Sequence, residues 1–281
     1  MDIRVIQPEA VADTVRRLCI QANTTLPPDI DAALAAAIER ETEPVAVSCL
    51  QACRDNLALA ARESLPVCQD TGLAVVFIQM GHRVVVDGDL RAAVDEGVRR
   101  GYRDGYLRCS VTRDPLRRGN TGDNTPAVLY MEPVMGDTMT ITVAPKGFGS
   151  ENMSRLYMLT PAEGRAEVIE VITETVRLAG ANPCPPVILG VGVGGTADAA
   201  MLAAKQQLLR PLDRPNPDPW YAELERDALK AVNALGIGPQ GLGGRCTALG
   251  VHIAPLATHI AGLPVAVNVG CHVTRHGVGA V

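Results

Sequence analysis

The sequence is poor in aromatic residues and has no long apolar run. Phe, Trp and Tyr make up 3% of the 281 residues, with one Trp and two Phe, so the core must consist mainly of Val, Leu, Ile and Ala. No run of about 18 apolar residues occurs, which argues against a membrane-spanning helix. The first residues, MDIRVIQPEAVADTVRRLC, lack the charged-then-apolar pattern of a signal peptide. We therefore expect a cytoplasmic protein.

A strong excess of charge of either sign is also lacking. The net charge is −5, and the isoelectric point is near 5.6. This mildly acidic balance provides no electrostatic basis for binding nucleic acid or an anionic membrane. A hydrophobic fraction of 47% is typical of a globular protein and excludes a disordered chain. An anionic substrate would have to be held by a few placed arginines, because the overall field is slightly repulsive.

The hydrophobic pattern predicts an α/β fold, with a mixed α+β arrangement left open. A helical N-terminal layer is expected from residues 9–22, 29–41 and 44–62, with Asp29 as a helix N-cap. From Leu73 onwards, short β-branched runs bounded by glycine indicate strands mixed with helices. The order of strands in the sheet cannot be predicted. Further strands are expected at 73–80, 83–88, 139–144, 187–191, 251–254 and 264–269, and further helices at 89–105, 161–179, 196–209 and 218–235.

Cysteine is abundant for a chain of this kind. In a cytoplasmic protein, this number argues against a disulfide framework and leaves packing, metal ligation or nucleophilic roles. Cys49 and Cys53 lie four residues apart on a predicted helix. We interpret them as core residues, because a metal site with two cysteines normally needs more ligands nearby. The eight cysteines are Cys19, Cys49, Cys53, Cys68, Cys109, Cys184, Cys246 and Cys271.

Four glycine-rich regions with polar side chains lie among the predicted strands. Loops at strand ends are where a rigid scaffold presents functional groups. In the first region Cys68, Gln69 and Asp70 precede a strand, and these residues alone fit a functional loop and a plain turn equally well. The last region places Cys271 beside His272. The regions are 66–72, 146–152, 182–186, and 241–276 with its segments 241–244, 258–259 and 270–276.

The segment GVGVGG at residues 190–195 invites a dinucleotide-binding interpretation, which we reject. Its spacing is not GxGxxG, and no P-loop lysine follows it. A weaker hypothesis survives, in which the glycine-rich turn opens a helix at about Thr196 and binds a carboxylate or phosphate there.

Six segments together resemble one family, the class I fumarases and the related α subunits of tartrate dehydratase, in their N-terminal cluster-binding region. They occur in the order of the family and extend over nearly the whole chain. The resemblance implies that Cys68, Cys184 and Cys271 hold a [4Fe–4S] cluster with one open iron, which can act as a Lewis acid. The segments are CQDTG (68–72), NTGDNTPA (120–127), KGFGSEN (146–152), NPCPP (182–186), GLGG (241–244) and THIAGLPVAVNVGCHVTRH (258–276).

The resemblance also implies an activity, the reversible hydration of fumarate to (S)-malate, and roles for single residues. Asp70 is expected to handle the proton or water, with His259 as its partner. Gln69, Arg108 and Gly149 are expected to contact the dicarboxylate substrate. Arginine suits this task because its guanidinium binds a carboxylate through two parallel hydrogen bonds. We expect Cys109 and Cys246 to have packing roles, and we assign none to Arg275 and His276.

The sequence ends shortly after the third cysteine motif, whereas single-chain relatives continue with a catalytic C-terminal domain. We therefore expect residues 1–281 to form a single cluster-binding domain, the α subunit of an α2β2 enzyme in which α homodimerises and which is active only with its β subunit. Within the same class, an L-tartrate dehydratase or mesaconate hydratase α subunit is the alternative. A non-catalytic iron–sulfur redox or regulatory protein is the alternative from another class. It is disfavoured by the three-cysteine set and by Asp70 and Arg108 near the motifs.

Overall fold

The computed structural model describes residues 3–281, which form an α/β protein divided into two compact units. Unit 1 contains the described residues up to Leu26, together with Leu59–Phe148 and Arg275–Val281. Unit 2 contains Pro27–Ala58 and Gly149–Thr274. The α/β fold class predicted from the sequence is confirmed, and the description of residues 1–281 as one domain stays a prediction. No helix in the described part of the chain is long and apolar enough to cross a membrane.

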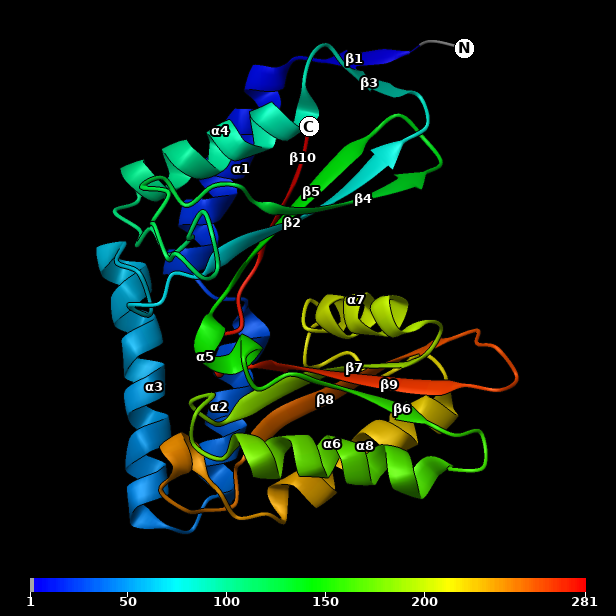
Figure 1. The fold of residues 1–281 in the computed structure, drawn as a ribbon. Coiled ribbons are helices and arrows are strands. Elements are labelled where there is room, and N and C mark those ends of the chain that lie inside the picture. Colours follow the sequence, from blue (N-terminus) through cyan, green and yellow to red (C-terminus); the bar gives the residue numbers. More distant parts are fainter. Residues whose placement is uncertain (1–2) are drawn as a thin grey trace. The chain divides into compact units, whose positions relative to one another are not determined.

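Unit 1 is built on a four-stranded sheet with the order β10-β5-β2-β4, in which β2 runs parallel to β4 and antiparallel to β5. Ala74, Val76 and Ile78 alternate along β2 and are buried in the same apolar core as residues of α1 and α4. These two helices lie side by side in Figure 1. The elements are β1 (Arg4–Ile6), α1 (Pro8–Thr24), β2 (Leu73–Gly81), β3 (Val84–Val86), α4 (Leu90–Asp104), β4 (Val128–Val134), β5 (Met139–Lys146) and β10 (Gly277–Ala280).

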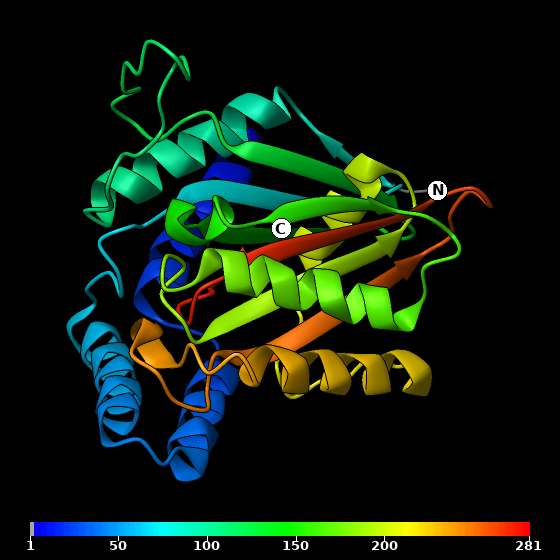
Figure 2. The same ribbon diagram turned by 60° about the horizontal axis from the view of Figure 1, so that its bottom comes forward.

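Unit 2 has its own four-stranded sheet with the order β6-β9-β7-β8, in which β9 is antiparallel to both its neighbours and β7 is parallel to β8. Figures 1 and 2 show α7 on one face of this sheet and α6 with α8 on the other. The elements are α2 (Pro28–Arg40), α3 (Pro44–Glu63, ending in unit 1), α5 (Phe148–Glu151, starting in unit 1), β6 (Arg155–Leu159), α6 (Arg165–Ala179), β7 (Val187–Gly194), α7 (Ala197–Gln207), α8 (Pro219–Asn233), the 3-10 turn η1 (Pro239–Gly241), β8 (Ala248–Leu256) and β9 (Leu263–Gly270).

The glycines of GVGVGG serve the packing of α7 on β7. A Cβ atom on Gly190 would lie 2.0 Å from the carbonyl oxygen of Ala204, and one on Gly192 would lie 2.2 Å from that of Ala200. Only glycine permits so close an approach of strand and helix. This segment is a buried strand and not a phosphate-binding loop, which agrees with our rejection of a dinucleotide site.

The helices and strands predicted from hydrophobic periodicity are all present, with ends that differ by a few residues. Asp29 does not cap α2, so that prediction is wrong: Pro27 occupies the cap position, and the Asp29 carboxylate accepts a hydrogen bond from the backbone N–H of Leu212 at 2.8 Å. Four strands were not predicted, namely β1, β4, β6 and β10. The first and last have three and four residues, and β4 is an edge strand with Glu132 and Pro133 exposed, so none shows a long apolar alternation.

One buried carboxylate ties α8 to β8 and to the connector before α8. Glu225 is 6% exposed and pairs with the guanidinium of Arg210. It also accepts the backbone N–H of Ile253 at 2.7 Å and that of Asn216 at 3.1 Å. A buried charge is tolerable when all its partners are present, and its removal leaves the others unsatisfied.

We therefore predict that Glu225→Gln lowers the free energy of unfolding by about 3 kcal/mol, because Arg210 loses its counter-charge in a buried site. Urea unfolding followed by circular dichroism measures this value. Glu223→Gln on the same helix is the control, since this side chain is 57% exposed and its ion pair with Arg165 is long, at 3.9 Å. It should change stability by less than about 0.5 kcal/mol. Equal effects of the two substitutions would contradict the structural role of Glu225.

Candidate functional site

In unit 1 the loop before β2 holds Asp70 in a fixed position. One carboxylate oxygen of Asp70 accepts the backbone N–H of Gly72 at 3.0 Å, and the other accepts that of Phe148 at 2.9 Å. The guanidinium of Arg275, which is 4% exposed, donates to the Asp70 carbonyl. Gly147 lies directly against the carboxylate, because a Cβ on it would be 3.1 Å from an Asp70 oxygen. Asp70 is therefore oriented by groups from three separate segments.

Buried polar side chains also hold this loop, and the sequence analysis did not identify them as part of the site. The Tyr102 hydroxyl lies 2.9 Å from the carbonyl oxygens of both Thr71 and Gly72, and it is 1% exposed. Asn124, which is fully buried, donates to Gly72 at 3.2 Å. Asn124 lies within the motif NTGDNTPA, so the motif was a usable signal, whereas nothing in the sequence distinguishes Tyr102.

Cys68 and Gln69 belong to the same loop as Asp70, and the main chain of Arg108 contacts it. The Cys68 thiol contacts the side-chain oxygen of Gln69 at 3.3 Å and accepts the backbone N–H of Asp70 at 3.4 Å. Arg108 is held through its main chain by two hydrogen bonds with the Thr71 hydroxyl, of 2.9 and 3.2 Å. Its side chain is exposed, and within the described part of the chain its guanidinium makes no hydrogen bond or ion pair. Unit 1 thus brings together Cys68, Gln69, Asp70 and Arg108.

In unit 2 strand pairing brings Cys184 and Cys271 to one end of the sheet. Ile188, near the start of β7, pairs with Gly270, the last residue of antiparallel β9. Cys184 precedes β7 and Cys271 follows β9, so both thiol-bearing loops emerge at that end. A direct contact joins them, since Nδ1 of His272 lies 3.0 Å from the Cys184 carbonyl oxygen. A carbonyl can only accept, so this nitrogen carries the proton.

The loop of Cys184 is held in an unusual backbone conformation. Cys184 has φ of 54°, in the left-handed region that non-glycine residues rarely adopt, and its side chain is exposed. Gln240 donates its backbone N–H and its side-chain amide to the Pro185 carbonyl, at 2.7 and 2.9 Å. Gly241, the first residue of GLGG, packs on Ala181, where a Cβ would meet the alanine methyl at 2.4 Å. The GLGG motif therefore supports the Cys184 loop.

His259 and Gly149 also lie in unit 2. His259 is exposed in the turn between β8 and β9, and its Nδ1 accepts the backbone N–H of Ala261 at 3.1 Å. The neutral imidazole must then carry its proton on Nε2, where it can donate. Gly149 is in α5, and a Cβ there would lie 3.6 Å from the Asn182 carbonyl. Asp70 belongs to unit 1, so its predicted partnership with His259 stays a prediction.

Three of the remaining cysteines, Cys19, Cys53 and Cys246, are buried. Burial raises the pKa of Cys19 to about 12, and that of Cys246 to about 11. Burial, followed by the neighbouring charges of Cys49, Cys271 and Cys184, raises the pKa of Cys53 to about 11. These thiols stay protonated at neutral pH, whereas metal ligation requires the thiolate. Cys109 is half-buried, and burial raises its pKa as well.

The donor chemistry fits an iron–sulfur cluster. All eight cysteines lie in the described part of the chain, and none is in a disulfide. Cys184 is exposed, and Cys68 and Cys271 are half-buried. Within residues 3–281 no three Cys, His, Asp or Glu side chains surround a position for a single metal ion. A cluster makes no such demand, because each thiolate binds a different iron atom.

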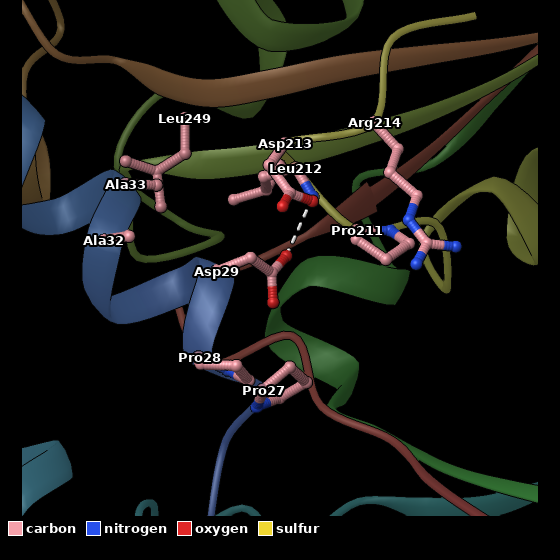
Figure 3. A pocket seen from close by; sticks show the side chains of 10 residues that line it. All are labelled: Pro27, Pro28, Asp29, Ala32, Ala33, Pro211, Leu212, Asp213, Arg214 and Leu249. Atoms are coloured by element: carbon pink, nitrogen blue, oxygen red, sulfur yellow. Dashed lines mark hydrogen bonds between the residues drawn. The ribbon is translucent and has the colours of Figure 1, made fainter. Parts of the chain in front are cut away.

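Two further features in unit 2 do not provide a site. A hollow of about 590 Å³ between the start of α2 and the connector after α7 contains none of the predicted site residues, and Figure 3 shows its Asp29 turned toward the Leu212 backbone. The helix start at Thr196 was predicted as an anion site. There the Thr196 hydroxyl donates to the Asp198 carboxylate at 2.6 Å, and this bond lowers the Asp198 pKa. The carboxylate of Asp198 therefore takes the place at this helix start where an anionic ligand was predicted to bind.

The fold and site define an α/β protein that presents a fixed carboxylate and accessible thiols on loops at strand ends. The family model described as "Fumarate hydratase (Fumerase)" matches residues 12–279. A protein of Methanocaldococcus jannaschii named "Putative L(+)-tartrate dehydratase subunit alpha" is 36% identical over 275 residues, covering 95% of this chain and 96% of that protein. L(+)-tartrate dehydratase subunit alpha of Escherichia coli K12 is 31% identical over 270 residues, covering 95% and 89%. The chain belongs to the fumarate hydratase family of hydro-lyases.

The environments of the thiols predict their reactivity. At pH 8 a thiol with a pKa of about 11 is ionised to roughly one part in a thousand. We expect iodoacetamide to alkylate exposed Cys184 at least about tenfold faster than Cys53 or Cys246 in the protein without iron, as measured by peptide mass spectrometry. The same reaction in urea is the control and should remove the difference. Alkylation of Cys53 in the folded protein as fast as that of Cys184 would contradict its packing role.

Proposed function

We propose that the chain is the α subunit of an iron–sulfur hydro-lyase that interconverts fumarate and (S)-malate. The observation that carries this proposal is the convergence of Cys184 and Cys271 at one end of the unit 2 sheet, with His272 joining their loops. A core cysteine would not need an exposed position with a left-handed backbone, whereas a ligand does need access.

Cys68, Cys184 and Cys271 are the proposed ligands of a [4Fe–4S] cluster. Three thiolates leave one of four irons without a protein ligand, and when bound the cluster would supply a Lewis acid at that iron. Buried Cys19, Cys53 and Cys246 are poor candidates because their protons are held tightly. The proposed set therefore consists of the cysteines that are both accessible and carried on the family motifs.

The chain's own residues would bind the substrate and move protons. Arg108 presents a guanidinium that can clamp one carboxylate through two hydrogen bonds. Asp70 is oriented through both oxygens, and each keeps a lone pair that can accept a proton from water. Gln69 offers an amide beside the Cys68 thiol. His259, with its proton on Nε2, can donate to a developing hydroxide.

The requirement for a second subunit is part of the proposal. The relatives from M. jannaschii and E. coli are both named as subunit alpha, and each is matched over nearly its full length. We propose that this chain likewise works with a β subunit, in an α2β2 assembly, and that it resides in the cytoplasm. Alone it would hold the cluster without completing the substrate pocket.

L(+)-tartrate is the second candidate substrate, because the names of both relatives favour it. Malate and tartrate share the two carboxylates, one of which Arg108 would clamp, and they differ in that tartrate carries a second hydroxyl group. Assays of the complex with its β subunit under anaerobic conditions, with malate, tartrate and mesaconate compared by kcat/KM, separate the candidates. A preference for tartrate of about a hundredfold or more would replace fumarate as the substrate.

The ligand set predicts the outcome of cysteine replacement. After anaerobic reconstitution with iron and sulfide, Cys68→Ser, Cys184→Ser and Cys271→Ser should each lose most of the cluster's visible absorption and the iron that remains bound. Cys246→Ser is the control and should bind iron like the wild type, since that thiol is buried. A variant of the first three that keeps an unchanged spectrum would remove that residue from the ligand set.

The clamp predicted for Arg108 can be tested by Arg108→Lys in the complex with the β subunit. Lysine keeps the charge and loses the paired hydrogen bonds, so we expect KM for the dicarboxylate to rise about tenfold or more. Arg103→Lys is the matched control, because Arg103 is 70% exposed and pairs with Asp104. Unchanged KM with Arg108→Lys would show that another group binds the carboxylate.

A further inference from the structure

Thr71, the fourth residue of the CQDTG segment, has no part in the proposed chemistry, yet it is almost completely buried. It is 2% exposed, and its hydroxyl lies against the main chain of Arg108, 37 residues further along the chain. The hydroxyl oxygen accepts the backbone N–H of Arg108 at 2.9 Å, and the hydroxyl donates to the Arg108 carbonyl at 3.2 Å. One side chain thus bonds both main-chain polar groups of a single residue.

This pair of bonds fixes the direction in which the Arg108 side chain leaves the backbone. The N–H belongs to the peptide plane before the Cα atom, and the carbonyl belongs to the plane after it. When both planes are held, φ and ψ of Arg108 are held too, and with them the direction of the Cα–Cβ bond. Arg108 lies in an irregular segment, so no helix or strand holds it. Within residues 3–281 no other group bonds its N–H or its carbonyl.

The segment that carries Arg108 is attached to the Asp70 loop at a second point. Asn124, which is fully buried, accepts the backbone N–H groups of residues 110 and 111 at 2.7 and 3.2 Å. Its amide nitrogen donates to the Gly72 carbonyl at 3.2 Å. These bonds lie beyond Arg108 and secure the segment as a whole, whereas the Thr71 hydroxyl bonds the backbone of Arg108 itself.

We propose that Thr71 is a positioning residue for substrate binding, and that its hydroxyl directs the Arg108 guanidinium toward one carboxylate of the substrate. This proposal rests on the proposed function, in which Arg108 clamps that carboxylate. A guanidinium that binds a carboxylate through two parallel hydrogen bonds depends on orientation as well as on charge. Thr71 also follows Asp70 directly in the sequence, so a role through Asp70 is the alternative. A displaced Asp70 would change kcat and its pH dependence, whereas a misdirected clamp changes KM.

The test compares Thr71→Val with Thr71→Ser in the complex with the β subunit. Valine has nearly the shape of threonine without the hydroxyl, whereas serine keeps the hydroxyl. With malate or tartrate, whichever the complex converts, Thr71→Val should raise KM about tenfold or more, with kcat within about threefold and an unchanged pH profile. Thr71→Ser should stay within about twofold of the wild-type KM. Thr173→Val is the matched control and should leave KM unchanged, because Thr173 is 6% exposed and its hydroxyl donates to Ile169 within α6.

Combination with Arg108→Lys shows whether Thr71 acts through Arg108. Because that substitution already removes the paired hydrogen bonds, adding Thr71→Val should raise KM by less than about twofold further. A further tenfold rise would show that Thr71 acts through another group and would overturn the proposal.

Hydrogen exchange at the Arg108 amide provides a readout that needs no substrate. Mass spectrometry with electron-transfer fragmentation measures it in the same complexes. Exchange should be about tenfold faster or more in Thr71→Val, which lacks the acceptor, and close to the wild-type rate in Thr71→Ser. An unchanged rate in Thr71→Val would show that the hydroxyl does not hold this part of the backbone, and would overturn the proposal.

The kinetic outcomes separate the positioning role from the proposed function. A wild-type complex without hydro-lyase activity refutes the proposed function, and the positioning role falls with it. An active wild-type complex in which Thr71→Val keeps the wild-type KM, or changes kcat and its pH profile instead, refutes the positioning role alone. A rise in KM that Thr71→Ser shares refutes it as well. Thr71→Ala also lacks the hydroxyl and must show the same rise in KM as Thr71→Val, which covers the case in which valine does not fit the buried site.

Discussion

The pairing of β7 with β9 is the constraint on which the candidate site depends. Because the strands are antiparallel, the start of one lies beside the end of the other, and Ile188 meets Gly270. Cysteines that are far apart in sequence thereby reach the same end of the sheet. A slip by one residue would turn every side chain of β9 to the opposite face. Both faces of β9 are buried from Val265 to Val269, so a slip would also move buried Asn268 away from Glu151, to which its side chain donates at 3.1 Å.

In each unit, the loops that carry the candidate site residues are ordered mainly by backbone groups and buried polar side chains. Asp70 takes two backbone N–H groups, and Gln240 supplies two donors to the Pro185 carbonyl. Such bonds cost little where water is excluded, and leaving them unmade would cost more. The result is a set of groups that hydrogen bonds within the chain already hold in place. Preorganisation of this kind is what a catalytic site requires, since reorganisation during the reaction would raise the barrier.

The sequence allowed the helices and the long strands to be predicted, because each has a local signal, and the proposed site residues rest on motifs that are equally local. Periodicity marks α1, α3 and α8, and the motifs mark Cys68, Cys184 and Cys271. The sheet orders could not be predicted, since the pairing of β7 with β9 depends on contacts across many residues. The division into two units was likewise hidden, because unit 1 takes its segments from both ends and the middle of the chain. The role of Tyr102 depends on tertiary contact alone.

The positions of Arg108 and Arg275 bear on how the proposed dicarboxylate substrate would be held. A dicarboxylate has two negative ends, and each needs a cationic or strongly donating partner to offset its desolvation. Arg108 can serve one end. Arg275 also lies beside Asp70, but it is buried and donates to the Asp70 carbonyl, so it positions the loop and cannot reach a ligand as well. The partner for the second carboxylate would then come from outside the Asp70 loop, and the candidates are the open iron of the proposed cluster and a group of the proposed β subunit.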